Sequence, residues 1–126
     1  MKSEFQFKFE ELTIYDKAID FGEAVYKQIQ TFPKEELHLL TARFSKAADD
    51  LAVNIANGAM SNDVIEFMTC LQLAYDEAHD CIVCSTKAKL RGYISAEQDE
   101  KNRMEVTELA KMLQAYQNHL QSKHGE

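Results

Sequence analysis

The sequence of 126 residues contains no tryptophan, a single proline and four glycines. Because proline and glycine are the strongest helix breakers, their scarcity favours a helical protein. No stretch approaches the roughly 20 apolar residues of a membrane-spanning helix, and residues 1–20 lack the apolar region of a signal peptide. Three cysteines is an odd number, which pairing within one chain cannot use up. We therefore expect free thiols, a cytoplasmic location and no membrane contact.

Positive charge is also scarce, since 14 Lys and Arg stand against 21 Asp and Glu and the net charge is −7. This excess of negative charge disfavours nucleic acid and anionic membranes as partners. Basic residues are scattered along the chain, among them Lys27, Lys34, Arg43, Lys46, Lys87, Lys89, Arg91, Lys101 and Arg103. The run from Lys87 to Arg91 lies at the expected C-terminal end of the third helix, where cations suit the helix dipole. The sequence does not indicate a nucleic-acid contact there.

Apolar residues recur at helical spacing along almost the whole chain, which has 45% hydrophobic residues. The pattern predicts four helices over about 10–30, 33–57, 63–91 and 95–121. The joints between them are short, so neighbouring helices must run antiparallel. We predict one all-α domain over 1–126, an up-down-up-down four-helix bundle with an N-terminal arm over 1–9 and a frayed tail over 122–126.

Each expected helix has an apolar stripe that should face the others. On the first helix it is Leu12, Tyr15, Ile19, Gly22, Tyr26 and Ile29, widened by Ala18 and Val25, and on the fourth it is Val106, Leu109, Leu113, Tyr116 and Leu120. On the second helix, Asn54 is the one polar member of the stripe, which predicts a buried, hydrogen-bonded amide that fixes packing register. Gly58 is predicted to cap that helix in a left-handed conformation.

Two kinds of residue pair could ligate a metal. Cys81-x-x-Cys84 has the spacing of half a zinc site, but no second Cys/His pair completes it. Glu35-x-x-His38 and Asp76-x-x-His79 have the Glu-x-x-His-like spacing of di-iron carboxylate bundles, but the stripes place them on outer helix faces. The acidic neighbours Asp49 and Asp50 lack a nucleophile or oxyanion donor beside them. The sequence therefore predicts no catalytic, cofactor or metal site, and a metal-carboxylate oxidase is the weakest alternative.

The apolar stripes are broader than one small bundle can bury. The third helix adds Met68, Leu73, Tyr75 and Ile82 outside its own stripe. Large apolar patches on soluble proteins usually mark contacts with other proteins. We therefore expect a homo-oligomer, with the chain itself as its main partner.

Three stretches of the chain, 9–20, 25–58 and 64–80, together resemble the four-helix-bundle family of 23S rRNA intervening-sequence proteins. That family also includes accessory variability determinants of diversity-generating retroelements. The resemblance spans about residues 9–120, and the most specific residues are Phe32, Pro33, Glu36, Ala47, Asn54, Ile55, Ala56 and Gly58.

The resemblance implies an antiparallel four-helix bundle that forms a homo-oligomer, typically a pentamer with a central channel, and it brings no catalytic residues. Retroelement members bind nucleic acid and a reverse transcriptase through basic surfaces. At the matching positions this chain loses arginines and gains aspartates such as Asp50. The expected function is thus a non-enzymatic, ring-forming assembly or adaptor protein, and an RNA- or DNA-binding accessory protein is the alternative.

Overall fold

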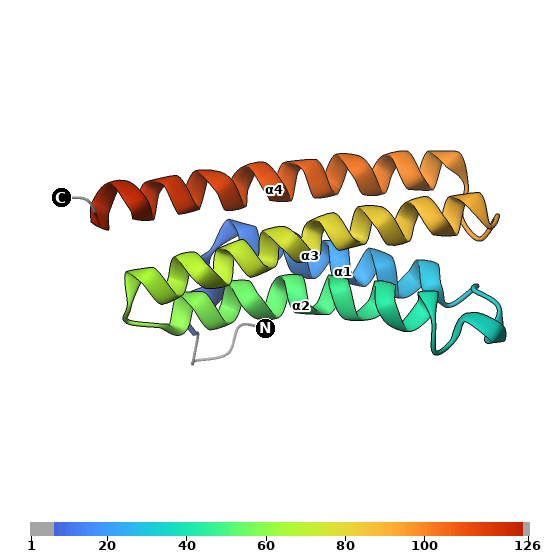
Figure 1. Cartoon of the computed structure of the whole chain (residues 1–126), viewed down its shortest axis with the longest axis horizontal. Coiled ribbons are helices and arrows are strands. Elements are labelled where there is room, and N and C mark those ends of the chain that lie inside the picture. Colours follow the sequence, from blue (N-terminus) through green and yellow to red (C-terminus); the bar gives the residue numbers. More distant parts are fainter. Residues whose placement is uncertain (1–6, 125–126) are drawn as a thin grey trace.

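Four helices run alternately in opposite directions in the computed structural model of the chain (Figure 1), which describes residues 7–124. They are α1 (Thr13–Ile29), α2 (Leu40–Met60), α3 (Val64–Leu90) and α4 (Ala96–His124), with short 3-10 turns η1 (Lys8–Glu11) and η2 (Lys34–Glu36). Each helix packs on the next, and α1 also contacts α4, which closes the bundle. The predicted all-α, up-down-up-down fold is confirmed. None of the described helices is both long enough and apolar enough to cross a membrane.

The buried face of α1 includes Ala18 and Val25, which were predicted to widen the stripe, but it is displaced by about one residue from the main stripe. The buried side chains follow steps of four, three and four residues: Ile14, Ala18, Phe21 and Val25. In the predicted stripe, Ile19 and Tyr26 are 40% and 58% exposed. This helix therefore carries two adjacent apolar faces, and the bundle buries only one of them.

The second helix begins later and ends later than the sequence pattern predicts. Pro33 precedes η2 instead of opening α2, and a turn separates η2 from Leu40, so Leu37 and Leu39 are exposed. Gly58 lies inside α2 and not at its cap, which corrects the prediction. A Cβ there would lie 2.8 Å from both Cys70 and Phe67, so glycine permits the close approach of α2 and α3.

The ends of the other helices also follow local chemistry. Asp63 caps α3, since its carboxylate accepts from the Ile65 N–H, and Gly92 ends it with a positive φ of 78°. The Ser95 hydroxyl accepts a hydrogen bond from the Gln98 N–H at 3.0 Å and so caps the start of α4. Contrary to the predicted frayed tail, α4 continues to His124.

The predicted N-terminal arm falls largely on residues 1–6, outside the described part. Its last residues form the η1 turn. Phe9 is half-buried there and packs edge-on against Tyr15, with ring centroids 4.9 Å apart.

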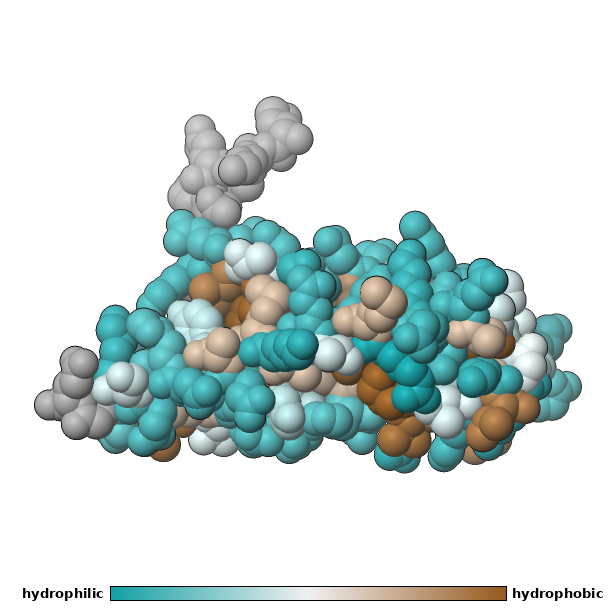
Figure 2. All heavy atoms as spheres, turned by 90° about the horizontal axis from the view of Figure 1, so that it is seen from above, coloured by the Kyte–Doolittle hydropathy of each residue, from teal (hydrophilic) through white to brown (hydrophobic). Residues whose placement is uncertain are grey.

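The core is a single cluster built from the inner faces of all four helices. Its largest fully buried side chains include Phe21, Phe44, Leu51, Ile55, Leu71, Leu109 and Leu113. The outer surface on the α4 side is mostly hydrophilic, with scattered apolar areas (Figure 2). The other helices also expose large apolar side chains, such as Tyr26 of α1 and Val53 of α2.

Candidate functional site

The residues that the sequence singled out do not converge on one site. Ala47 and Ile55 are buried in the core, and Phe32 packs against Tyr93 with ring centroids 5.2 Å apart. Ala56 is half-buried between α1 and α2. These residues shape the bundle, and their shared role is packing.

Asn54 does not occupy the predicted buried position. Its side chain is half-buried on the flank of α2, and within residues 7–124 it has no hydrogen-bond partner. The prediction of a buried structural amide on α2 was therefore wrong. Ile55, the next residue, points into the core in its place.

Glu36 is a buried carboxylate that joins the two connections at one end of the bundle. Its Oε2 accepts hydrogen bonds from the Tyr93 hydroxyl at 2.8 Å and from Arg91 at 2.9 Å, and its Oε1 accepts from the Leu40 N–H at 3.4 Å. The Tyr93 hydrogen bond lowers the pKa of Glu36; burial opposes this shift, and Leu40 and Arg91 reinforce it. A carboxylate engaged on both oxygens acts as a clamp and is a poor general base.

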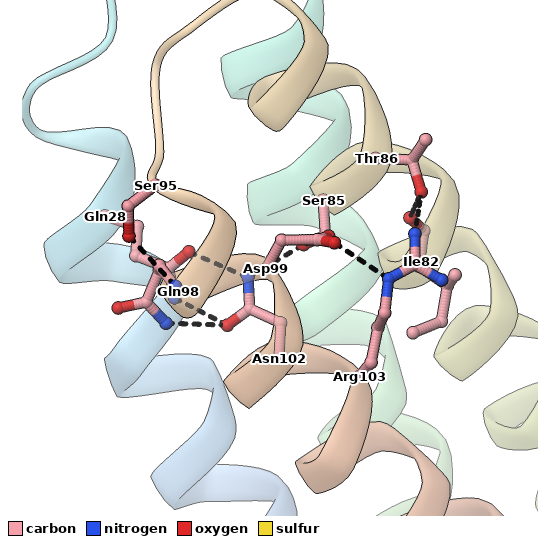
Figure 3. Close-up of polar contacts among 9 residues, drawn as sticks. All are labelled: Gln28, Ile82, Ser85, Thr86, Ser95, Gln98, Asp99, Asn102 and Arg103. Carbon is pink, nitrogen blue, oxygen red and sulfur yellow. Dashed lines mark hydrogen bonds and ion pairs between the residues drawn. The ribbon is translucent and has the colours of Figure 1, made fainter.

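A second polar cluster, which the sequence analysis missed, lies between α1, α3 and α4 (Figure 3). Asn102 is 1% exposed and exchanges two hydrogen bonds with Gln28, both at 2.9 Å. It also donates to the Ser85 hydroxyl at 2.9 Å and accepts from Gln98 at 3.0 Å. Every polar atom of this buried amide is thus satisfied, as a buried polar group requires.

Asp99 extends the same cluster towards the outside of the bundle (Figure 3). It accepts a hydrogen bond from Ser85 at 2.7 Å and one from Arg103 at 2.9 Å, and Arg103 also donates to Thr86. Burial by itself would raise the pKa of Asp99, but the bonds from Arg103 and Ser85 bring it below its usual value. Ser85 is hydrogen-bonded directly to the ionised Asp99, without a histidine between them, so the pair lacks the general base of a catalytic triad.

One signal in the sequence could have revealed this cluster. The spacing of Val106, Leu109 and Leu113, continued towards the N-terminus, reaches Asn102 and Asp99. Both residues are polar, so an apolar-stripe search stops before them. Extending the period through polar residues would have placed them inside the bundle.

The candidate metal ligands are not brought together. Cys81 and Cys84 are buried, and burial raises the pKa of both thiols. His38 and His79 are exposed on the outer faces of the bundle, as the stripes predicted. Among residues 7–124, no three His, Cys, Asp or Glu side chains lie close enough to hold a metal.

An apolar groove of about 390 Å³ runs between α1 and α2. Small residues of both helices line it, and Gly22 lies so near α2 that an added Cβ would be 4.0 Å from the Ala48 carbonyl. Ile19 and Val53, 40% and 50% exposed, contribute large apolar side chains to the groove lining. Asp49 lines the same groove, whereas Asp50 pairs with Lys46 at 2.5 Å, so the two neighbouring acids have separate surroundings. The groove therefore leaves apolar side chains of α1 and α2 outside the bundle core.

The geometry therefore defines a small antiparallel four-helix bundle with self-satisfied polar clusters and an uncovered apolar groove between α1 and α2. The family model described as 23S rRNA-intervening sequence protein matches residues 10–115, and the chain belongs to this family. This confirms the resemblance that the sequence motifs indicated.

A solved structure supports the same fold. It is the crystal structure of a protein with unknown function from the S23 ribosomal protein family of Bacteroides thetaiotaomicron VPI-5482, with a TM-score of 0.76 and 19% identity. The alignment covers 82% of this chain and 97% of that chain. No curated protein matches the chain.

Proposed function

We propose that this protein is a non-enzymatic assembly module whose copies associate through the groove between α1 and α2. The observation that carries this proposal is the second apolar face of α1. Ile19 and Tyr26 lie on it at helical spacing outside the bundle core, and Ile19 lines the groove together with Val53 of α2. An apolar face of this kind is typical of a surface that a partner covers.

The shape of the groove supports a helix of a second copy as the partner. Its lining includes Ala18, Gly22, Ala52 and Ala56, which allow a helix backbone to approach closely. Helix α3 offers exposed apolar side chains on another part of the same molecule, at Ile65, Leu73 and Val83. When two different surfaces of one chain meet, the contact is heterologous and closes into a ring if the rotation allows.

The family resemblance sets the proposed number of copies at five and the role as an assembly or adaptor protein. The interior chemistry supports a non-enzymatic role. Ser85, Asp99 and Asn102 bond to one another and are at most 3% exposed, so a substrate has no access to them. Buried networks that satisfy themselves chiefly specify packing.

Light scattering coupled to size-exclusion chromatography tests the proposal. The wild-type protein should have a mass of about five times the 14.4 kDa of one chain. Val53→Glu buries a charge in the contact and should shift the protein to the monomer mass, because an unpaired buried charge is strongly unfavourable. Met104→Glu is the matched control: Met104 is 66% exposed on α4, outside the groove, and this variant should keep the wild-type mass.

A wild-type mass of 14.4 kDa at micromolar concentration would reject self-association altogether. An unchanged mass in Val53→Glu would reject the groove as the contact. Circular dichroism of Val53→Glu and Met104→Glu checks that each variant still folds as a helical bundle.

A further inference from the structure

A second cavity, of about 580 Å³, lies between the start of α2 and the end of α3. Four of its lining residues are basic, and Glu36 is the one acid among them; the basic residues are Arg43, Lys46, Lys87 and Arg91. The chain as a whole has a net charge of −7, so this concentration of positive charge is unlike the rest of the molecule. The sequence shows these residues as two separated pairs, and folding brings them together.

The antiparallel register of α2 and α3 places the four cations in a row. Arg91 bonds to Glu36 at one end of the α2–α3 boundary, and Gly58 lies against Phe67 and Cys70 at the other end. The same register puts Lys87 level with Leu40 and Lys46 level with Cys81. At about 1.5 Å per helical residue, the row spans about 15 Å along the boundary between the helices.

The two central cations are available to a ligand. Arg91 is compensated by Glu36 at 2.9 Å, and Lys46 by Asp50 at 2.5 Å. Within residues 7–124, no ion pair involves Arg43 or Lys87, and both side chains are exposed. The positive end of the α2 dipole, at Leu40, lies in the same cavity and adds to the attraction for an anion.

We propose that this row binds a short anion with two or three linked phosphate groups. A guanidinium binds phosphate oxygens in a fork, and ammonium groups add point charges, so a row of both matches several phosphates in line. A short ligand fits better than a long one because the surface beyond Lys46 is acidic. There Glu77 has a raised pKa, caused by its burial and by the neighbouring Asp80 and Asp50. An extended nucleic acid would have to pass over these carboxylates.

Calorimetric titration of the purified protein with inorganic tripolyphosphate at low ionic strength tests this site. We expect saturable binding with one site per chain. Lys87→Gln should weaken it by roughly tenfold, because one charge-assisted hydrogen bond is lost, and Lys87→Arg should retain it. Arg43→Gln should weaken binding similarly. Lys89→Gln is the matched control, since Lys89 is exposed at the same end of α3 but does not line the cavity.

Three results would overturn the proposal. The first is the absence of saturable binding to the wild type. The second is an equal loss in Lys87→Gln and Lys89→Gln, which would show a general charge effect. The third is displacement of tripolyphosphate by single-stranded RNA. If the affinity of the protein for that RNA rises with RNA length and falls in Lys87→Gln, the row is a nucleic-acid contact. Lys87 is exposed, so its exchange leaves the core intact, and the light-scattering mass of the same sample reports assembly separately.

Discussion

Replacing Asn102 by alanine tests the buried polar cluster most directly. The Asn102 side chain makes four hydrogen bonds, two with Gln28 and one each with Ser85 and Gln98. At roughly 1 kcal/mol net for each bond, their loss costs about 4 kcal/mol. Alanine is the better helix former by about 0.7 kcal/mol, which offsets part of this loss. We expect Asn102→Ala to lower the free energy of unfolding by about 3 kcal/mol.

The sequence itself supplies the matched control. Asn54 is the amide that the apolar stripe placed in the core, but it is half-buried and without a hydrogen-bond partner in the described part of the chain. Asn54→Ala should therefore leave the stability unchanged or raise it by up to about 0.7 kcal/mol through helix propensity. The two variants make the same chemical change, so their difference isolates the surroundings of the amide.

Urea unfolding followed by circular dichroism measures both variants at one fixed protein concentration, because self-association would make stability depend on concentration. With a typical slope of about 1–3 kcal/mol per molar urea, Asn102→Ala should lower the midpoint by about 1–3 M. A loss below about 1 kcal/mol for Asn102→Ala, or a loss as large for Asn54→Ala, would refute the role assigned to the cluster.

Three further predictions concern backbone contact, pH and thiols. Gly58→Ala should destabilise the bundle by about 1 kcal/mol, since overpacking of about 1–3 kcal/mol exceeds the gain in helix propensity. Gly22→Ala should stabilise it by up to about 1 kcal/mol, because a Cβ at Gly22 meets no close contact. The urea midpoints of the two variants measure the difference. Because the pKa of Glu36 is lowered in the folded protein, its ionised form stabilises the fold above the usual pKa of 4.5, and this stability is lost as the pH falls below 4.5. Glu36→Gln should therefore be less stable than the wild type at pH 7. Its thermal unfolding should also depend less on acid pH. Cys81 and Cys84 should react with a thiol reagent much more slowly than half-buried Cys70 in the native protein, and all three equally in urea; fast reaction of all three without urea would contradict their burial.

The helical fold could be predicted from the sequence because its main signal is long and repeated. The stripe on α4 from Val106 to Leu120 continues for two full heptads, and the joints beside Gly92 and Ser95 carry their own turn chemistry. Antiparallel packing then follows from the short connections. The family motifs in the first two helices pointed to the same architecture.

The position of the buried face on α1 was predicted only in part, through Ala18 and Val25, for a physical reason. Residues such as Ile14 and Phe21 on one side, and Ile19 and Tyr26 on the other, form two stripes of similar strength. Periodicity gives the spacing of a stripe, but only packing against α2 and α4 decides which stripe is inside. The late start of α2 has a similar cause, because the tertiary bonds of Glu36 hold the preceding turn.

The polar sites depend on pairs that are distant in the sequence. Gln28 meets Asn102, and Glu36 meets Arg91, through contacts that only the folded bundle creates. The basic row arises in the same way from two pairs of residues on different helices. Spacing along one helix contains no information about such partners.

The bundle is fastened unevenly along its length. The Glu36 clamp and the Asn102 cluster both lie at the end where α1 connects to α2 and α3 to α4 (Figure 1). Towards the opposite end, the inter-helix side-chain bonds include those of Gln117, which are 3.3 Å long. Transient opening should therefore begin at the α2–α3 corner, and backbone amides around residues 57–70 should take up deuterium before those around 82–106. Local stability should therefore be lower at the α2–α3 end of the bundle than at the end that holds the Glu36 and Asn102 contacts.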